Sequence, residues 1–397
     1  MQNNFKKIML IISLLALNVV EQAASVVNST IPGMAKSFPN ESLVHIELVT
    51  TVVSIFVTVF VLVSGIVVKR LGQKNTAVIG LAIATVSSII PAFANNFWLI
   101  FASRAVLGIG IGLANPLAIS LIGTFFHGDE RAKLLGWRSA IAGVGTSLMT
   151  YFAGQLLSIN WHAAYWVYLL FVPTLIFFII FVPNPEKEGL INDDEEKASV
   201  ASEEIDDSNK KDSPMLVAIL AILTFIFLTA GMVFAVKLPT YFVDFKVGTP
   251  TQASNAWSIH SIANLIGGAA FGYIYKRINK YILPLGLLLD GAGIVVASFT
   301  KSVIGMYIIC IVTGAFAAMV IPYIFNRISE TSSASKAPLY TSIVLVGSNL
   351  GSFLSPYTGK LIGSTSAGSI LNAGIILVVL AAIVFVWFIL RLNPSKK

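Results

Sequence analysis

The sequence predicts an all-α integral membrane protein whose twelve transmembrane helices form two six-helix repeats. The prediction rests on composition, hydropathy and the spacing of the apolar runs. Of the 397 residues, 56% are hydrophobic and 11% are charged, whereas an ordinary soluble domain is about 25% charged. Mean hydropathy is +0.84. A water-soluble chain of this length could not bury so much apolar surface in one core, so lipid must surround much of it.

Apolar runs long enough to cross a bilayer recur along the whole chain. A hydrocarbon core about 30 Å thick requires roughly 20 apolar residues in a helix. The first run follows Lys6 and Lys7 as in a secretory signal, but its apolar character continues past Glu21 to Ile31, which favours a transmembrane helix. The predicted helices cover residues 8–31, 46–68, 76–94, 98–125, 136–158 and 164–182, followed by 215–236, 252–275, 281–299, 302–326, 338–361 and 369–391.

An acidic segment separates the two sets of helices. Eleven of the 19 acidic residues lie between Glu186 and Asp212. Because this segment is rich in charged and polar residues and has almost no aliphatic cluster, it cannot bury enough surface to fold, and we expect a flexible cytoplasmic linker. A regulatory role for it is the alternative. The predicted domains are an N-terminal six-helix bundle over 1–183, the linker over 184–213 and a C-terminal six-helix bundle over 214–397.

The basic residues predict the orientation of the helices. With the N-terminus in the cytoplasm, sixteen Lys and Arg residues outside the linker lie on the inner side and five on the outer side, a clear positive-inside bias. The inner set includes Arg138, close to the start of the predicted fifth helix. We therefore predict a multi-pass protein of the cell membrane with both termini in the cytoplasm. Since these residues occupy short loops between apolar runs, no nucleic-acid partner is expected. The five outer residues are Lys36, Lys237, Lys246, Lys301 and Lys360.

Short motifs recur in both halves at nearly the same offset. GIVVKRLGQK at residues 65–74 is matched by GYIYKRINKY at residues 272–281, an offset of 207. Gly108 in the fourth helix is matched by Gly314, an offset of 206. Together these matches indicate a duplicated six-helix unit, a form of internal repeat that is common in secondary transporters.

The first of these segments resembles the loop between helices 2 and 3 of the major facilitator superfamily, whose signature is Gly-x-x-x-Asp-Arg-x-Gly-Arg-Lys. Lys69 stands where that family has Asp, and Lys276 repeats the substitution in the second half. In the family this Asp helps to lock the cytoplasmic gate, so the resemblance implies a gating loop whose usual charge contact is changed here. The predicted gating residues are Gly65, Lys69, Arg70, Gly72 and Lys74.

Further motifs are similar to those of the drug/proton antiporter-like branch of that superfamily. In the fourth helix, Arg104, Gly108 and Gly112 resemble the Arg-x-x-x-Gly pattern of proton-linked members. DERAKLLGW at 129–137 and WHAAYWVYLLFVP at 161–173 also resemble antiporter sequences, whereas the fifth helix keeps only the last glycine of the antiporter motif. The resemblance covers essentially the whole chain and implies the major facilitator fold, with transport by alternating access.

Motifs for other chemistries are missing from the sequence. There is no Gly-x-x-x-x-Gly-Lys-Ser/Thr phosphate loop, no His-Glu-x-x-His and no Gly-x-Ser-x-Gly. Cys310 is the only cysteine and lies in an apolar run, which excludes a metal site that rests on cysteine. We therefore predict a protein that is not an enzyme, that needs no cofactor and that draws on an ion gradient.

Polar residues inside the spans are the candidates for a functional site, because an ionisable group in hydrocarbon is costly and usually faces a cavity or a partner. In the first helix the polar residues from Asn18 to Ser29 have helical spacing that places them on one face. Each candidate has a structural alternative. For the stripe it is helix packing, and for His260 it is a hydrogen bond. For Asp290 it is a buried polar contact, and for Lys237 it is an ammonium group that reaches the interface. The proton-coupling candidates are Glu21, Arg104 and Asp290, and the substrate-cavity candidates are Asn18, Gln22, Ser25, Asn115, Lys237, Trp257, His260, Asn264 and Asn349.

Glu21 and Arg104 are predicted to lie at the same depth and to form a coupled pair. Glu21 is thirteen residues from the inner end of its helix near Ile8, which is about 20 Å. Arg104 is about 9 Å below the outer boundary near Trp98. In a core about 30 Å thick the two reach nearly the same level. A change in their separation would load or release a proton, and the alternative is a permanent structural ion pair.

The function that these features favour is proton-coupled efflux of amphipathic or lipophilic small organic compounds by a monomer in the lipid bilayer. An uptake or exchange carrier for a small organic anion is the alternative within the transporter class, because Arg104 and Lys237 are basic and the fifth-helix motif is degraded. A membrane sensor or scaffold without transport is the alternative from another class.

Overall fold

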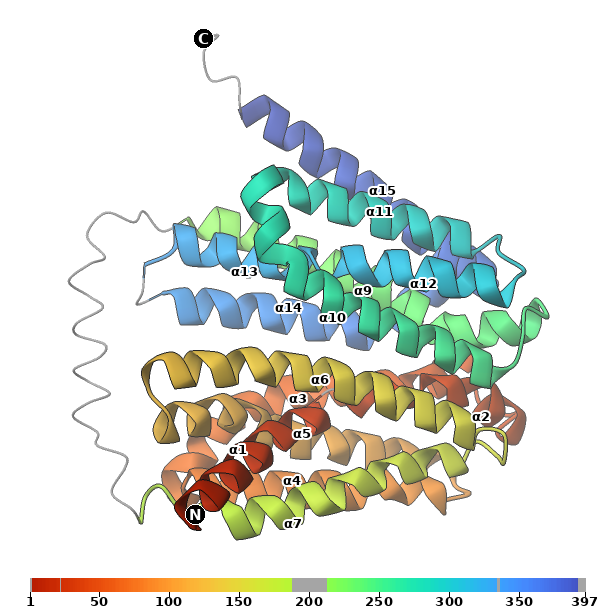
Figure 1. Cartoon of the computed structure of the whole chain (residues 1–397). Helices are drawn as coiled ribbons and strands as arrows, with labels where there is room; N and C mark the ends of the chain where they lie inside the picture. The colour runs from red at the N-terminus through yellow and green to blue at the C-terminus, as the bar shows by residue number, and fades with distance from the viewer. Residues whose placement is uncertain (1, 22, 188–212, 334–335, 392–397) are drawn as a thin grey trace. The chain divides into compact units, whose positions relative to one another are not determined.

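The structure is a computed structural model, and it describes residues 2–21, 23–187, 213–333 and 336–391. The chain divides into two compact units, Met1–Ala198 and Ser199–Lys397, here called unit 1 and unit 2 (Figure 1). In both units the described residues form long helices joined by short connections. Most of the predicted linker, 184–213, lies outside the described residues, so that prediction is not tested.

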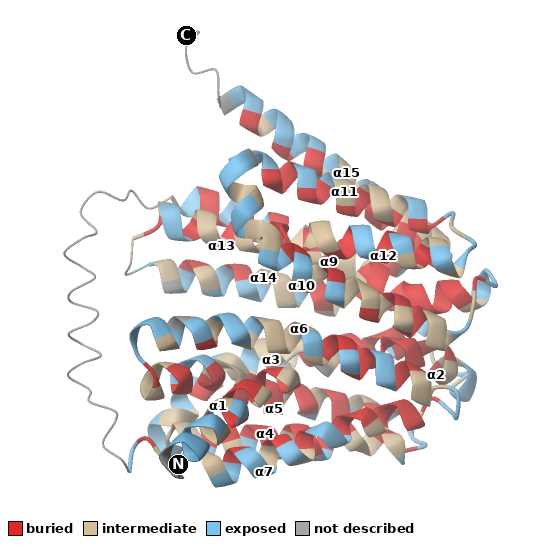
Figure 2. Cartoon of the chain, viewed as in Figure 1, coloured by how far each residue is buried: buried red, intermediate tan, exposed pale blue. Residues whose placement is uncertain are grey.

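Unit 1 is built around its fourth long helix, α5, which packs against α1, α3, α4 and α6. Of its most apolar 18-residue window, 61% is buried, and Figure 2 shows the buried positions along it. The described elements of unit 1 are α1 (Gln2–Glu21), η1 (Ala23–Thr30), α2 (Ile31–Ser37), α3 (Leu43–Leu71), α4 (Gln73–Ile89), η2 (Ile90–Ala92), α5 (Phe97–Phe125), α6 (Gly128–Leu156), η3 (Ala163–Leu170) and α7 (Phe171–Phe181), where η marks a 3₁₀-helix.

Unit 2 has two central pairings, in which its first helix, α9, packs against α14 and α15, and α10 packs against α12. The α11 helix joins these pairs because it contacts both α12 and α15. The described elements of unit 2 are α9 (Pro214–Asp244), α10 (Pro250–Ile278), η4 (Asn279–Tyr281), α11 (Ile282–Ala297), α12 (Val303–Ala317), α13 (Val320–Thr331), α14 (Ala337–Ile362) and α15 (Ser366–Arg391).

Capping residues set where several long helices begin. The side chain of Ser42 accepts the His45 N–H at the start of α3, and Asn96 does the same for Leu99 at the start of α5. Thr249 and Gln252 form a reciprocal capping box at the start of α10. Each cap satisfies an N–H group that has no partner inside the helix, and its loss costs typically about 1 kcal/mol.

Among the residues that the structure describes, eight helical segments are long and apolar enough to cross a membrane, and nine if the bent pair of α1 with η1 and α2 counts as one span. One of the eight, Pro250–Ala297, contains two helices, because Asn279 with a φ of 47° ends α10. The α6 and α14 helices are 29 and 26 residues long and complete six long helical stretches in each unit. Within the described residues the predicted twelve-helix membrane fold is therefore confirmed.

Glycine contacts confirm that the two units repeat one pattern of packing. A Cβ on Gly108 of α5 would lie 2.5 Å from the carbonyl oxygen of Val53 in α3. A Cβ on Gly314 of α12 would lie 2.3 Å from the carbonyl oxygen of His260 in α10. These distances are far below van der Waals contact, so each glycine lets two helices approach closely. The offsets between the equivalent residues are 206 and 207, as in the sequence motifs.

A second pair of contacts follows the same rule. Gly80 of α4 packs against the carbonyl of Gly110 in α5, and Gly286 of α11 packs against the carbonyl of Phe316 in α12. Both residues of each contact are shifted by 206 positions between the units. The duplication therefore extends to which helix faces meet, beyond the motifs that first indicated it.

Candidate functional site

The first long helix of unit 1 is broken. The α1 helix ends at Glu21, the next described turns are 3₁₀, and Val27 has non-helical angles of φ −103° and ψ 17°. The segments on either side are bent by 47°. Because a 3₁₀-helix has three residues per turn, the α-helical spacing that predicts one polar face from Asn18 to Ser29 ends with α1, and the shared face beyond it stays a prediction. Backbone groups released at such a break need other partners when the surroundings exclude water.

Arg104 supplies one such partner, to the carbonyl of Ala24. Its side chain is 0% exposed and it donates three hydrogen bonds: Nη2 to the Ala24 carbonyl at 2.8 Å, Nε to the Val49 carbonyl at 3.3 Å and Nη1 to the Tyr168 hydroxyl at 3.2 Å. The guanidinium thus connects η1, α3 and η3 to α5. Arginine suits this position because its planar group carries five donors and stays charged.

The surroundings of Arg104 compensate part of the cost of burying its charge. The rings of Tyr165 and Tyr168 lie 5.9 and 5.6 Å from the Arg104 Cζ atom, within the range of cation–π attraction. Glu47 of α3, two residues before Val49, is also 0% exposed. The sequence gives no signal for the burial of Glu47, because it stands in the first turns of an apolar run, where acids usually face the interface.

Glu21, the predicted partner of Arg104, is the last residue of α1, and its side chain lies outside what the structure describes. Gln22 lies outside the described residues altogether. Arg104 bonds the carbonyl of Ala24, three residues beyond Glu21. The pairing of Glu21 with Arg104 therefore stays a prediction. The three hydrogen bonds of Arg104 show its structural role.

A second polar cluster brings together two of the predicted cavity residues. Arg138 of α6 donates from Nε to Asn18 Oδ1 in α1 and from Nη2 to Asn115 Oδ1 in α5, the latter at 3.4 Å. The Asn18 amide nitrogen in turn donates to the carbonyls of Leu14 and Leu15. Arg138 is half-buried. The cluster thus places a guanidinium among three helices with part of its surface open.

The sequence places Arg138 close to the start of its predicted helix, whereas α6 begins earlier in the chain. The predicted helix began at residue 136, but α6 begins at Gly128. Arg138 therefore lies ten residues inside α6, which is about 15 Å from its start. The hydropathy pattern misses this start of α6, because the charged residues of its first turns lower the hydropathy below that of a membrane span.

The remaining polar residues after the break are mostly enclosed. Ser25 is half-buried, and Asn28 is 3% exposed. Among the described residues, the Asn28 amide nitrogen and oxygen are both buried and have no hydrogen-bond partner. Buried amides are almost always satisfied in folded proteins, so Asn28 marks a position where a water or a ligand atom would fit the chemistry.

In unit 2 the predicted residues are spread over several helices. Trp257 and His260 of α10 stack with ring centroids 4.4 Å apart and an interplanar angle of 6°. Asn264 and Asn349 are half-buried on α10 and α14. Asp290 is 3% exposed on α11. Among the described residues, no hydrogen bond joins Asp290, Asn264 or Asn349 to another predicted site residue.

Lys237 lies inside its helix rather than at the end that the sequence indicates. The predicted helix ended at residue 236, but α9 continues to Asp244. Lys237 is only 5% exposed, and a Cβ on Gly359 of α14 would lie 3.1 Å from its Cε atom. The lysine stem is therefore packed against α14 inside unit 2.

The predicted gating loop is held by the residue that opens the acidic segment. Gly72 has a φ of 81°, and the Gln73 N–H at the start of α4 donates to Glu186 Oε1. Lys74 Nζ donates to the Ile179 carbonyl at 2.9 Å. A carboxylate suits a helix N-terminus, whose free N–H groups carry partial positive charge. The side chains of Lys69 and Arg70 are exposed, and a Cβ on Gly65 would meet open space.

Comparison with known proteins assigns the family. The Major Facilitator Superfamily matches this sequence over residues 13–279 and again over residues 220–397. The chain belongs to this superfamily. Solved structures agree, since a crystal structure of the peptide transporter POT in complex with sulfate has a TM-score of 0.74 over 95% of this chain and 93% of that chain. At 13% identity, this likeness shows the fold alone.

Several curated relatives in the superfamily are named for drug export or drug resistance. The multidrug transporter protein MdtP of Bacillus subtilis is 32% identical over 134 residues, or 34% of this chain and 24% of that protein. The lincomycin resistance protein LmrB of the same organism is 23% identical over 86% of this chain and 63% of its own length. The riboflavin transporter RibZ of Clostridioides difficile is 22% identical over 90% of this chain and 81% of its own length. The chain thus spans about a quarter of MdtP and four fifths of RibZ.

Proposed function

We propose that this major facilitator protein exports amphipathic or lipophilic small organic compounds by alternating access, driven by protons. Relatives named for multidrug transport and for lincomycin resistance support export. The single observation in this chain that supports a substrate site is the cluster of Arg138 with Asn18 and Asn115. It combines a few polar groups with otherwise apolar helices, the composition usual for sites that take amphipathic ligands.

In this proposal Arg104 positions the broken first helix and Arg138 contacts substrate. The three hydrogen bonds of Arg104 use carbonyl and hydroxyl groups that surround the break. Discontinuous helices in transporters often supply backbone groups to a binding site. Arg138 is half-buried and donates to the amide oxygens of Asn18 and Asn115. In this proposal its guanidinium contacts a polar or anionic group on an otherwise apolar compound.

Glu21 carries the proton in this proposal. It is the one acid in the predicted first span and stands directly at the break. Glu21→Gln should lose proton-driven transport and keep downhill exchange of substrate, measured in proteoliposomes with an imposed pH gradient and riboflavin or ethidium as probe. The matched control is Asp129→Asn, an exposed acid in the first turn of α6. Uphill transport by Glu21→Gln at the wild-type rate would refute the coupling role.

An uptake or exchange carrier for a small organic anion is the second candidate. Two observations favour it: the match to a riboflavin transporter over 90% of this chain, and the basic residues Arg138 and Lys237 inside the helices of the two units. With substrate added to one side only, the sign of the proton flux separates the two candidates, because an antiporter moves protons against the direction of the substrate and a symporter moves them with it. Absence of substrate-dependent flux with every probe would favour a sensor or scaffold instead.

The proposal includes the arrangement of the protein in the cell. The chain acts as a monomer in the cell membrane, with both termini in the cytoplasm, as the bias of basic residues indicates. A protease added outside intact cells should leave both terminal tags uncut. Cleavage of either tag under these conditions would show that this terminus lies outside the cell and would contradict the proposed orientation.

A further inference from the structure

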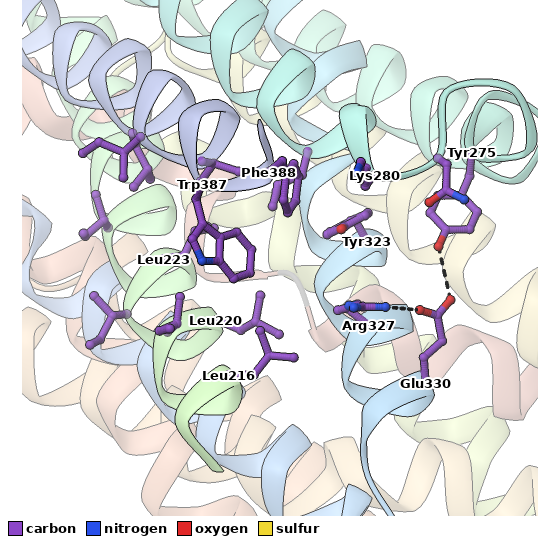
Figure 3. A pocket seen from close by; sticks show the side chains of 18 residues that line it. Leu216, Leu220, Leu223, Tyr275, Lys280, Tyr323, Arg327, Glu330, Trp387 and Phe388 are labelled. Atoms are coloured by element: carbon purple, nitrogen blue, oxygen red, sulfur yellow. Dashed lines mark hydrogen bonds and ion pairs between the residues drawn. The ribbon is translucent and has the colours of Figure 1, made fainter. Parts of the chain in front are cut away.

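Unit 2 contains a cavity of about 590 Å³ that the proposed transport site does not use. Its walls come from the first half of α9, the ends of α10 and α13, the start of α11 and the last turns of α15. This volume lies within the range of about 300–1,000 Å³ that is typical of small-molecule sites. Figure 3 shows the side chains that line it.

One side of the cavity is a long apolar wall. Leu216, Leu220 and Leu223 of α9 follow one another at helical spacing and line the cavity together. Figure 3 shows Trp387 and Phe388 beside this row of leucines. The lining residues of α9 run from 216 to 226, which is about 15 Å along the helix. The wall has the length and character of a slot for a hydrocarbon chain.

The cavity opens on an apolar surface. Ile222 of α9 and Ile383 of α15 belong to its lining, and each is 60% exposed. Exposed isoleucines on a membrane-spanning helix face the acyl chains of the bilayer. A lipid tail would therefore enter the slot sideways from the membrane.

The other side of the cavity is polar and carries excess positive charge. Arg327 Nη1 pairs with Glu330 Oε2 at 3.0 Å, and the Tyr275 hydroxyl donates to Glu330 Oε1 at 3.2 Å. Lys280 lines the same side, and Figure 3 shows it across from the leucine row with Arg327 and Glu330. Two cations against one carboxylate leave a net charge of +1 among the lining residues. Arginine has five donors, so Arg327 keeps donors for a second acceptor while it bonds Glu330.

The polar side lies where an anionic lipid headgroup would be found. Lys276 and Arg277 close α10 next to it, and the basic residues at this end of unit 2 belong to the inner side by the charge bias. The cytoplasmic leaflet carries anionic lipids that attract such residues.

We propose that this pocket binds one acidic phospholipid of the cytoplasmic leaflet. One acyl chain lies along the Leu216–Leu223 side of α9 against the aromatic side chains of α15. The headgroup phosphate is bound by Arg327 and Lys280. The segment 272–281, the second copy of the loop motif, thus forms part of a lipid site, whereas the first copy is held by Glu186.

The test compares lipids that stay bound to the purified full-length protein. After reconstitution in equal parts of phosphatidylglycerol and phosphatidylcholine, native mass spectrometry should show a preference for phosphatidylglycerol. In the double variant Arg327→Gln/Lys280→Gln this preference should fall at least about tenfold, since each basic residue near the headgroup contributes to attraction. The control is Lys301→Gln/Lys360→Gln, two exposed lysines of unit 2 outside the pocket, which should keep the wild-type preference.

Two further variants keep the proposal falsifiable if the double variant does not fold. Glu330→Gln removes the competing carboxylate and should raise the preference for phosphatidylglycerol a few-fold, whereas a purely structural Glu330 would leave it unchanged. Leu220→Trp fills the slot and should lose the bound lipid of either kind. Ile308→Trp, on an exposed face of α12, should retain it.

The proposal is overturned if the control and pocket variants retain the same lipids. It is also overturned if phosphatidylcholine binds as well as phosphatidylglycerol, because the pocket would then accept any acyl chain. Displacement of the lipid by transported riboflavin or ethidium at transport concentrations would make the pocket a substrate route and would equally exclude a dedicated lipid site.

Discussion

The first helices of the two units differ although their surroundings repeat. In unit 1 the chain breaks between α1 and α2, whereas in unit 2 α9 runs without interruption from Pro214 to Asp244. The residue that holds the break is Arg104, and 206 positions later the equivalent residue of α12 is Cys310. Both side chains are 0% exposed. A thiol is a weak donor, so Cys310 could not satisfy released carbonyl groups.

The fourth long helices differ in the opposite sense. The α5 helix is continuous for 29 residues through Pro116, whereas its counterpart is split into α12 and α13 just before Pro322. Proline removes a helical hydrogen bond in both cases, so the sequence alone does not decide which helix breaks. The comparison indicates that the same glycine contacts are compatible with two different sets of helix breaks. Single polar residues, such as Arg104 in unit 1, then stabilise the breaks that are particular to one unit.

The largest effect is expected from Arg104→Leu. It leaves the Ala24 and Val49 carbonyls without this donor in a buried place, so we expect a loss of about 3–5 kcal/mol of stability. Cys310→Ala at the equivalent position of unit 2 should cost only about 1 kcal/mol. Thermal unfolding in detergent measures both. Equal melting temperatures for the two variants would break the comparison, since Arg104 would then not hold the helix break.

The shared glycine framework should respond alike in both units. Gly108→Ala and Gly314→Ala each place a Cβ within 2.5 Å of a backbone carbonyl oxygen, and the helices must separate, at a cost of about 1–3 kcal/mol. Gly268→Ala on α10 meets open space and should be neutral or stabilising by up to about 1 kcal/mol through helix propensity. If only one of the first two variants loses stability, the equivalent glycine contacts do not contribute equally to the stability of the two units.

The Arg138 cluster should be particular to unit 1. The position 206 residues later is Val344, which is 0% exposed on α14. Arg138→Gln removes charge-assisted hydrogen bonds, and we expect about a tenfold loss of substrate affinity with near-normal stability. Riboflavin or ethidium binding, followed by fluorescence, measures this. Arg131→Gln, exposed on the same helix, is the control, and an equal loss there would indicate a general charge effect.

The smallest effects are expected at the two loop copies. Gly72 and Asn279 are equivalent at an offset of 207, with φ values of 81° and 47°. Because this region favours glycine, Asn279→Gly should gain up to about 1 kcal/mol. Gly72→Asn should lose a similar amount or more, because a Cβ there would lie 2.8 Å from the Glu186 carboxyl carbon. Opposite shifts in melting temperature are the expected result, and shifts of the same sign would contradict it.

Much of the site could not be predicted from sequence, for reasons visible in single residues. Asn18 and Asn115 were identified as polar groups in apolar helices, which needs only composition and helical spacing. Their common partner Arg138 was missed, because hydropathy placed the start of its helix eight residues too late. Glu47 was missed because an acid near a helix start resembles an interface residue. Both errors arise where charged residues lie inside a helix, because they lower the local hydropathy and the pattern then predicts a helix end at that point.

The sequence by itself determined the membrane class, the twelve helices and their duplication. These follow from local properties, since a bilayer demands runs of fixed length and a repeat keeps its offset. Only the tertiary structure decided which helix breaks, which groups accept hydrogen bonds from Arg104 and which helix supplies the arginine that contacts Asn18 and Asn115. Such choices depend on donors and acceptors that are far apart in the chain, from Ala24 to Tyr168 around Arg104. Their pairing exists only after the helices have packed.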